Sequence, residues 1–407
     1  MAMSGGVDSS VAAALLLREG YEVVGVFMRL GSPGETLDTM EAVDSAQAAC
    51  DPKKLKIGHQ GCCSINDAAD ARLVAAHLGV PFYVVNFKKD FGRIIDYFVD
   101  EYAAGRTPNP CVRCNDWLKF GKLHEYAKQI GADFVASGHY ARIGDQAIEG
   151  SRDRVGLDSI PQSHGPTIPS PRLFRGLDHS KDQSYVLFGV PRAQLAHMLL
   201  PIGGLLKPRV RELAQQFGLP TFDKPDSQEI CFVPDNDYAG LVERRRPELA
   251  QSGAIVDTQG RTVGTHQGQH RFTIGQRRGV GVAFGHPIFV VGKDPATNTV
   301  TVGPREMLHV RACSAAEANW LIDEAMFSDW QPCLAKYRYN SAAVPARVRT
   351  SVPVASDAQG SPSGRTGTFD VEFDSPQTAV APGQAVVLYS ADEPDVVLGG
   401  GWIRAAS

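Results

Sequence analysis

Ser4-Gly5-Gly6-Val7-Asp8-Ser9-Ser10 runs directly into the Ala/Leu-rich segment Val11–Arg18. Glycines lack a Cβ and allow the backbone to approach an anion closely. The hydroxyl and N–H groups at a helix start supply hydrogen-bond donors, and the helix dipole favours negative charge there. No Gly-Lys-Ser/Thr follows, so the stretch differs from the common P-loop. It predicts a phosphate-binding turn before a helix, with an ordinary capped helix as the alternative.

Strand-like and helix-like segments alternate through the first half of the chain. The strand-like segments are Tyr21–Met28, Phe82–Phe87 and Phe134–Ser137. The helix-like segments are Asn66–Leu78, Lys119–Ile130, Arg192–Leu199 and Pro208–Phe217. Such alternation predicts βαβ units on a parallel sheet, hence an α/β fold class. The Pro/Gly/Ser-rich stretch Gly144–Pro171 interrupts the pattern and is interpreted as an insertion.

From about Gly253 the pattern changes to short alternating segments separated by Gly, Pro, Asn and Asp. These segments are Ile288–Val291, Thr299–Val302, Ala346–Val348, Thr368–Phe373 and Ala385–Tyr389. They predict an antiparallel β-sheet or barrel. We therefore expect a catalytic domain over residues 1–232 with its insertion at 144–171, a small central domain over 233–295, and a β-barrel domain over 296–407.

Composition sets wide limits on function. The 407 residues include 41 Lys+Arg and 45 Asp+Glu, which gives a net charge of −4. Apolar residues make up 43%, enough for several buried cores and too many for a disordered chain. No apolar run reaches the roughly 18–20 residues that a membrane helix needs, and the N-terminus has no signal-peptide pattern. We expect a cytoplasmic protein without a membrane partner.

The glycine-rich stretch resembles the PP-loop of the ATP pyrophosphatase family. Members cleave ATP between the α and β phosphates and adenylate a carbonyl oxygen. The resemblance implies ATP as cofactor, with Mg²⁺ held through ATP by Asp8. The implied nucleotide-binding residues are Met3, Ser4, Gly5, Gly6, Val7, Asp8, Ser9, Ser10, Met28 and Gly138. The family has an apolar strand before this loop, whereas only Met1–Met3 precede it here, too few for a buried central strand.

Three of the eight cysteines lie in motifs that suggest sulfur chemistry. Cys111 and Cys114 follow a Pro-rich turn in TPNPCVRCN, and Cys231 lies in DSQEICF. A thiolate is a strong nucleophile, especially where nearby cations such as Arg106 and Arg113 lower its pKa. A second cysteine can carry or release sulfur by disulfide exchange. A structural zinc site at the CxxC pair and an inert buried thiol at Cys231 are the alternatives.

Taken in order, these motifs resemble the bacterial tRNA-uridine 2-sulfurtransferases. The similarity extends through Leu173–Phe188, Phe272–Val282, Lys336–Asn340 and Ala381–Tyr389. It implies a PP-loop domain with a parallel sheet, a small central domain and a C-terminal antiparallel β-barrel. It also implies ATP-dependent 2-thiolation of the wobble uridine (position 34) of tRNAs of the Lys, Glu and Gln type. The uridine O2 would be adenylated and then displaced by persulfide sulfur, giving 2-thiouridine and AMP.

The resemblance assigns a role to each of the three cysteines. Cys114 would be the nucleophile, and Cys231 would carry the persulfide and form an alternate disulfide with Cys114. Much of the family has an aspartate, a candidate general base, where this chain has Cys111. Cys111 could replace that base, or Cys111, Cys114 and Cys231 could hold three corners of a [4Fe–4S] cluster. The sulfur would come from a donor protein or from sulfide.

Local charge indicates how a mildly acidic chain could bind RNA. The segment Arg172–Arg211 holds seven Lys/Arg and two Asp, and Arg261–Arg278 holds four Arg and no acid. Such clusters bind phosphates, although a solvated basic face is the alternative. The resemblance implies tRNA contacts at Asn109, Pro110, Cys111, His139, Lys181, Asp182, Gln183, Arg338, Tyr339 and Gln384.

Two other functions compete with an RNA sulfurtransferase. A PP-loop amidotransferase or ligase acting on a small molecule would need no sulfur-carrying cysteine pair. A metal-stabilised RNA-binding module would bind tRNA without ATP turnover.

Overall fold

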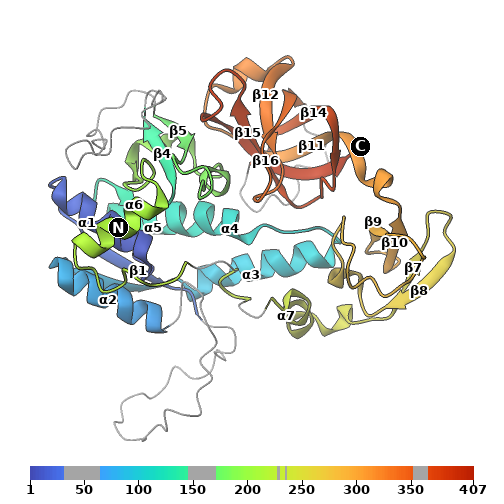
Figure 1. The fold of residues 1–407 in the computed structure, drawn as a ribbon, viewed down its shortest axis with the longest axis horizontal. Coiled ribbons are helices and arrows are strands. Elements are labelled where there is room, and N and C mark those ends of the chain that lie inside the picture. Colours follow the sequence, from blue (N-terminus) through green and yellow to red (C-terminus); the bar gives the residue numbers. More distant parts are fainter. Residues whose placement is uncertain (32–64, 145–170, 227–229, 234–235, 352–364) are drawn as a thin grey trace, which may run out of the picture.

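The computed structural model describes residues 1–31, 65–144, 171–226, 230–233, 236–351 and 365–407. Figure 1 shows three parts: an α/β part, a smaller part with its own sheet, and a barrel. Cys50, Cys62 and Cys63 lie outside the described residues, as does almost all of the predicted insertion at 144–171.

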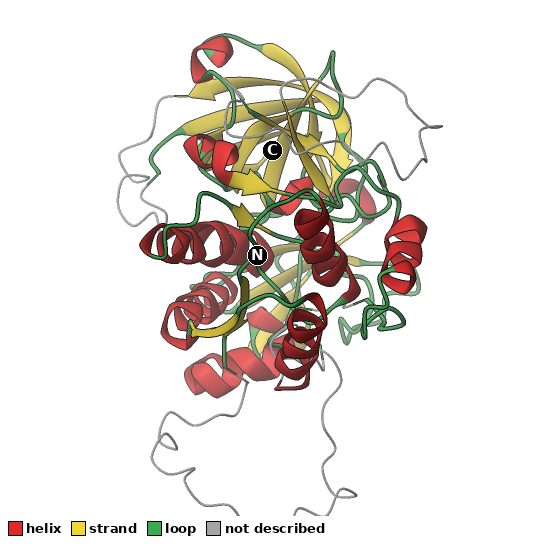
Figure 2. Cartoon of the chain, turned by 90° about the vertical axis from the view of Figure 1, so that its left-hand side faces the viewer, coloured by secondary structure: helices red, strands yellow, loops and turns green. Residues whose placement is uncertain are grey.

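The α/β part surrounds short parallel strands with helices (Figure 2). Its strands are β1 (Gly25–Arg29), β2 (Phe82–Asn86), β3 (Val135–Ala136), β4 (Ala141–Gly144), β5 (Arg172–Arg175) and β6 (Met198–Leu199). Its helices are α1 (Val7–Arg18), α2 (Ile65–Leu78), α3 (Lys88–Ala103), α4 (Pro110–Arg113), η1 (Cys114–Lys122), α5 (Leu123–Gln129), η2 (Ser184–Val186), η3 (Arg192–His197) and α6 (Lys207–Gln216). β1 pairs in parallel with β2, and β3 pairs in parallel with β6.

Met1–Met3 join these two strand pairs. Ala2 forms a parallel bridge with Val26 of β1, and its amide donates to the Ala136 carbonyl of β3 at 2.8 Å. The Met3 amide donates to Val26 at 2.9 Å, and the Met3 side chain is buried. As expected, these three residues are too few to form a strand of the sheet, but the bridge and these hydrogen bonds still hold them between β1 and β3. The glycine loop follows at the carboxyl edge of this parallel arrangement, where α/β folds place ligands.

Two predicted helices are present with different bounds or type. The helix expected over Arg192–Leu199 is a 3₁₀ helix that ends at His197, and Met198 and Leu199 pair with β3. The helix expected over Lys119–Ile130 consists of the end of η1 and of α5, and η1 is a π-helix that starts at Cys114. π-helical turns are rare and occur often at functional sites. The nucleophile expected from the sequence is thus the first residue of an unusual helix.

The central part is built on one four-stranded sheet in the order β8-β7-β10-β9. Its elements are α7 (Tyr238–Arg245), η4 (Pro247–Leu249), β7 (Gly253–Val256), β8 (Thr262–His266), η5 (Gln269–Arg271), β9 (Phe289–Asp294), β10 (Thr299–Gly303) and η6 (Arg305–Leu308). Because β10 pairs with both β7 and β9, the sheet continues past residue 295. Since η6 also packs against β9, we propose a boundary after Leu308 in place of the one expected at 295/296.

The last part is a closed barrel of six strands in the order β11-β14-β13-β12-β15-β16. Its elements are β11 (His309–Trp320), η7 (Glu324–Phe327), β12 (Gln331–Lys336), β13 (Val344–Ser351), β14 (Thr368–Thr378), β15 (Ala385–Ser390) and β16 (Val397–Ala406). Buried and exposed residues alternate along the middle of β13, as the pleat requires. All strand pairs are antiparallel, so the expected antiparallel barrel is confirmed.

One hydrophobic core crosses from the α/β part into the barrel. Tyr185 and Phe188 share it with Val387, Tyr389 and Trp402. The Tyr185 hydroxyl also donates to the Ala385 carbonyl at 2.9 Å. This shared core fixes the barrel on the helix that begins at Cys114. Among the described residues, no helix is both long and apolar enough to cross a membrane.

Candidate active site

The glycine loop leaves the start of α1 open to an anion. Gly5 has a φ of +72°, and a Cβ there would lie 2.2 Å from the Asp67 carbonyl oxygen. The Ser9 and Ser10 hydroxyls donate to the Gly6 carbonyl at 3.1 and 2.8 Å, which tightens the turn. Gly6 at the N-cap position has no side chain to occupy the first N–H groups of the helix. These donors and the helix dipole favour a phosphate at this point.

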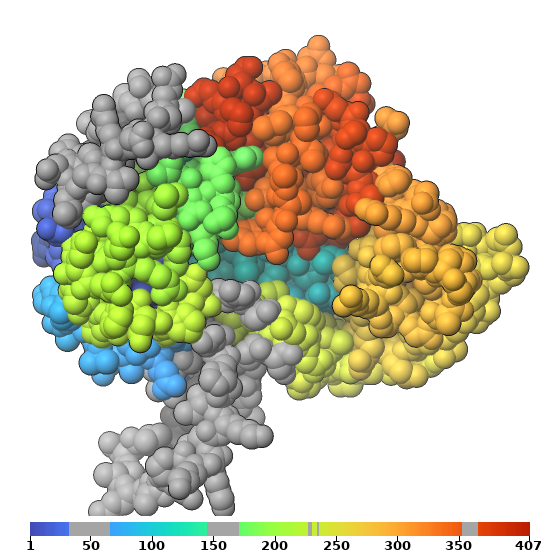
Figure 3. All heavy atoms as spheres, viewed as in Figure 1, coloured from blue at the N-terminus to red at the C-terminus, as the bar shows by residue number. Residues whose placement is uncertain are grey.

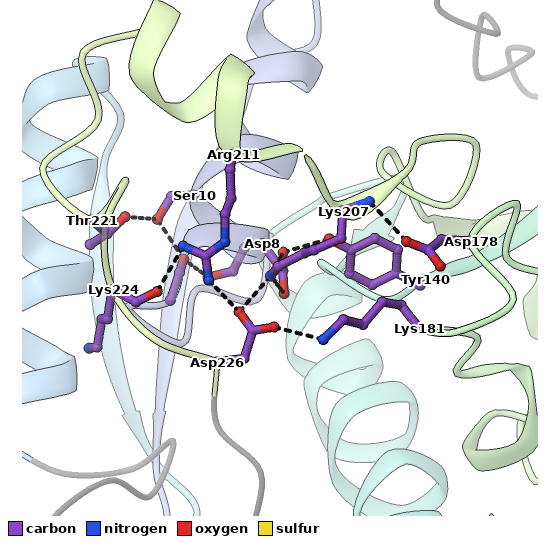
Figure 4. A network of polar contacts seen from close by, with 12 residues as sticks. Asp8, Ser10, Tyr140, Asp178, Lys181, Lys207, Arg211, Thr221, Lys224 and Asp226 are labelled. Atoms are coloured by element: carbon purple, nitrogen blue, oxygen red, sulfur yellow. Dashed lines mark hydrogen bonds and ion pairs between the residues drawn. The ribbon is translucent and has the colours of Figure 1, made fainter. Parts of the chain in front are cut away.

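Asp8 is the acidic residue of the loop, and a cation already lies against it (Figure 4). The Lys207 amine is 2.8 and 2.9 Å from its two carboxylate oxygens. The Tyr140 hydroxyl donates to Asp8 at 2.8 Å. Burial, and then the charge of Asp8, raise the pKa of Tyr140 and keep this hydroxyl a donor. The Asp8 carboxylate therefore faces a position that accepts positive charge.

Asp226 joins the glycine loop to the Cys231 motif. Its carboxylate lies 2.7 Å from Lys207, 2.9 Å from Lys181 and 3.0 Å from Arg211. Burial opposes ionisation, but hydrogen bonds from Lys207 and Lys181 hold the pKa of Asp226 below its usual value. Because Asp226 opens the DSQEICF motif, one carboxylate ties that motif to the lysine that neutralises Asp8.

Gly138 and Met28 lie at the same edge as the glycine loop. A Cβ on Gly138 would lie 2.7 Å from the Ser9 amide nitrogen and 2.8 Å from the Asp8 carbonyl carbon. Only glycine fits here without moving the loop. Met28 is partly buried near the end of β1, where it pairs with Val85. Both positions are consistent with the predicted nucleotide site.

The CxxC pair spans a short α-helix and the start of the π-helix. The Asn109 side chain accepts a hydrogen bond from the Val112 amide at 3.4 Å, and Pro110 occupies the first turn. Cys111 is exposed and Cys114 is partly buried. The turn thus presents one thiol to solvent and holds the other against the protein core.

Two ion pairs of opposite polarity fix the helix around Cys114 to the barrel. Arg113 donates to both carboxylate oxygens of Glu317 in β11, each at 2.9 Å. Only 2% of the Arg113 side chain and 7% of Glu317 are exposed. The Arg113 guanidinium also lies 4.0 Å from the Trp402 ring centre, a cation–π contact.

The second pair reverses the charges. Asp116 on η1 accepts from Arg365 at 3.1 and 3.2 Å. Burial raises the pKa of Asp116, and Arg365 opposes that rise. Cys114 therefore lies between a cation and an anion that are both bound by the barrel.

Both arginines expected near the thiols form ion pairs with carboxylates. Arg113 is buried and balanced by Glu317, and Arg106 forms an ion pair with Glu101 at 2.5 Å. Charges paired in this way exert a weaker field on a neighbouring group than unpaired ones. Both arginines serve the structure of the turn.

Cys114 and Cys231 pack against the same hydrophobic core. Cys231 is partly buried, and the adjacent Phe232 packs edge-on against Phe91 and Phe98. In the part of the chain that the structure describes, no three His, Cys, Asp or Glu side chains are grouped as metal ligands. Cys111, Cys114 and Cys231 are therefore not grouped as cluster ligands in this arrangement.

Among the tRNA contacts expected in the α/β part, several residues form internal hydrogen bonds. The Asp182 carboxylate accepts from Gly176 and Ser184, and the Gln183 side chain accepts from the Tyr140 amide at 2.9 Å. His139 is buried and bonds to the Ser137 hydroxyl at 2.7 Å. Burial, followed by the charge of Lys119, holds the pKa of His139 well below its usual value, so its ring is neutral.

Of the barrel residues expected to contact tRNA, Gln384 bonds directly to the Pro-rich turn. The Gln384 side chain donates to the carbonyls of Thr107 and Pro108 at 3.0 and 3.3 Å. Tyr339 is 42% exposed and lies edge-on to Tyr185 at 5.9 Å. Burial, then Asp182 and Cys111, raise the pKa of Tyr339, which places its ring near the exposed thiol. Arg338 donates to the Ala379 carbonyl at 2.7 Å.

Four residues of this site carried no role in the sequence interpretation: Lys207, Asp226, Glu317 and Arg365. Asp226 could have been noticed because it opens a quoted motif, and Lys207 because it lies in a basic segment. Glu317 is 204 positions from its partner, and no local pattern marks it.

Family profiles match almost the whole chain. Residues 1–235 match a tRNA methyl transferase HUP domain, residues 241–304 a tRNA methyl transferase PRC-barrel domain, and residues 310–403 an aminomethyltransferase beta-barrel domain. The PP-loop class of the first domain and the β class of the last are thereby confirmed.

Curated relatives are similar over their full length. A protein of Rhodopirellula baltica named tRNA-specific 2-thiouridylase MnmA is 45% identical, covering 100% of this chain and 96% of its own. Proteins of the same name from Geobacter metallireducens and Carboxydothermus hydrogenoformans are 44% and 43% identical. They cover 100% and 99% of this chain and 96% of their own.

Replacing Glu317 by Gln is expected to destabilise the protein by about 3–5 kcal/mol, because Arg113 would remain buried without its counter-charge. Urea unfolding followed by tryptophan fluorescence measures the effect, since Trp117 and Trp402 both contact Arg113. Glu372→Gln is the matched control: it breaks the exposed Arg347–Glu372 pair, which contributes about 0–1 kcal/mol. Equal losses in the two variants would contradict the assigned role of Glu317.

Proposed function

Because the chain belongs to the family of tRNA-specific 2-thiouridylases, we propose that it replaces O2 of a tRNA uridine with sulfur in an ATP-dependent reaction. The target is the wobble uridine of tRNAs of the Lys, Glu and Gln type. The observation that carries the proposal is the contact between the glycine loop and the Cys231 motif through Lys207, which bonds to both Asp8 and Asp226. This contact joins the residues for activation to those for sulfur transfer.

The glycine loop binds the phosphates of ATP in this proposal. The N–H groups at the start of α1 receive them, and Lys207 stabilises the pyrophosphate that leaves. Mg²⁺ fits Asp8, because the carboxylate already holds a cation at 2.8 Å; bound there, it would neutralise the phosphates. O2 of the uridine attacks the α-phosphorus, pyrophosphate departs, and the N3 proton is lost.

Sulfur transfer then uses the two partly buried thiols. The terminal sulfur of a Cys231 persulfide attacks C2 of the activated uridine, and AMP leaves. The Cys114 thiolate attacks the Cys231 sulfur, and the S–S electron pair passes to the nucleoside sulfur. The products are 2-thiouridine, which regains a proton at N3, and a Cys114–Cys231 disulfide. An external thiol reductant then restores both cysteines.

The Pro-rich turn and the barrel receive the target base. Asn109, Pro110 and the exposed Cys111 line the turn, and Tyr339 offers an exposed ring on which an unstacked base can lie. Cys111, near Tyr339, is the residue we assign to the proton transfer at N3. Lys181 supplies a partly exposed cation for the tRNA backbone, and Gln384 holds the turn in place.

The decisive experiment combines purified protein with transcribed tRNA, ATP and a persulfide donor. Thiolated tRNA is detected as a band retarded in a mercury-containing gel. Cys114→Ser and Cys231→Ser are each expected to abolish the product while leaving tRNA affinity within about twofold, because they remove only the sulfur relay. Cys333→Ser is the control, because this cysteine is buried in the barrel.

Two results would contradict the two-thiol mechanism. Thiolation retained by either variant is one. The other is activity that requires sulfide, in a protein that contains iron after anaerobic purification. This result would favour the cluster alternative at Cys111, Cys114 and Cys231. AMP release should equal thiouridine formed, whereas an RNA-binding module would release none.

Gly138→Ala is expected to weaken ATP binding by at least about tenfold, because the new methyl group would displace the backbone of Asp8 and Ser9. Isothermal titration with a non-hydrolysable ATP analogue measures this loss. Gly92→Ala is the control, since a Cβ in the middle of α3 meets no atom within 4 Å and alanine favours the helix. An unchanged affinity in Gly138→Ala would place the nucleotide elsewhere.

A further inference from the structure

A glycine-rich turn over residues 272–282 holds two adjacent arginines at the surface of the central part. Gly275 has a φ of +88°, and its amide donates to the Val290 carbonyl at 2.8 Å. The Gln276 side chain accepts from the Thr273 amide at 3.0 Å and donates to the Arg278 carbonyl at 2.9 Å. Hydrogen bonds at Thr273, Gly275 and Arg278 therefore hold the backbone of this turn in place. Arg277 and Arg278 are exposed on it.

These two arginines differ from the arginines that precede them in the central part of the chain. Five arginines between residues 244 and 271 form ion pairs with carboxylates: Arg244 with Asp237, Arg245 with Asp96, Arg246 with Asp100, Arg261 with Asp257, and Arg271 with Glu243. For Arg277 and Arg278, no carboxylate of the described residues lies within 4.0 Å. Two adjacent cations are thus held on a fixed turn without a counter-charge.

The turn packs against the barrel next to the proposed base site. A Cβ on Gly275 would lie 2.8 Å from the Ala379 Cβ and 3.7 Å from an Arg338 guanidinium nitrogen. From Ala379 the barrel chain runs to Pro382, whose carbonyl accepts from the Thr107 amide at 2.9 Å. The arginine turn, the barrel segment and the Pro-rich turn therefore form one continuous series of contacts. Figure 3 shows the atoms of the central part lying directly against those of the barrel.

We propose that Arg277 and Arg278 bind phosphates of the tRNA strand that carries the target base. The inference rests on the proposed function and extends it to a surface of the central part. Guanidinium groups pair with phosphate oxygens through two parallel hydrogen bonds, which suits an anionic strand. Such contacts set the register of the strand and carry no sequence information. The central part then places the strand while the Pro-rich turn and barrel receive the base.

The test compares two double variants that remove the same charge. Arg277→Gln/Arg278→Gln is expected to weaken binding of transcribed tRNA by at least about tenfold at ~0.1 M salt. It should also lower the slope of log Kd against log salt by roughly 1.5–2, the value for two lost phosphate contacts. Arg244→Gln/Arg245→Gln is the control, because those side chains already pair with Asp237 and Asp96. The control is expected to keep the affinity within twofold and to leave the slope unchanged.

Two further measurements separate a lost phosphate contact from a loss of folding or of chemistry. Thermal unfolding should be the same for both double variants, since none of the four side chains is buried. Single-turnover thiolation at saturating tRNA should match wild type, because the arginines touch no reacting atom. An unchanged slope in Arg277→Gln/Arg278→Gln, or an equal loss in the control, would overturn the inference. A wild-type protein that binds tRNA without thiolating it would instead contradict the proposed function and leave the contact standing.

Discussion

The buried pair between Arg113 and Glu317 is the constraint on which the site depends. It connects the residue before Cys114 to a barrel strand 204 positions away, and three aromatic rings surround the guanidinium. A charge moved out of water costs several kcal/mol, and only a close counter-charge offsets that cost. The barrel must therefore be folded and in place for the helix at Cys114 to be stable. The C-terminal part is in this sense a component of the candidate site.

A second carboxylate, that of Asp226, connects two parts of the proposed site, as Glu317 connects the helix at Cys114 to the barrel. Asp226 receives three cations, and one of them, Lys207, is shared with Asp8. In the proposed reaction, ATP would add negative charge at the glycine loop, close to these contacts. Asp226 opens the motif that contains Cys231, so the glycine loop and the first residue of that motif share a lysine. The two halves of the proposed reaction are thereby linked through one ion-pair network.

The sequence predicted the local features well and the distant pairings poorly. The glycine loop, the parallel α/β arrangement, the barrel and the three motif cysteines all follow from periodicity, glycine placement or resemblance, which are properties of adjacent residues. The contacts of Met1–Met3 with the strands on either side are hydrogen bonds to Val26 and Ala136, and no pattern of adjacent residues marks them. The same holds for the ion pair of Arg113. Its partner lies in another domain, and pairing decides what a charge can do.

That principle also resolves the conflict between the acidic net charge and an RNA substrate. A net charge of −4 counts every ion, including those already neutralised by a neighbour. At ~0.1 M salt, the field of an exposed charge is screened within about 10 Å. A phosphate strand therefore responds to the cations that it touches. In the central part, carboxylates occupy the arginines of α7 and leave Arg277 and Arg278 without one among the described residues. The distribution of partners, and not the number of basic residues, marks the surface on which an RNA strand can lie.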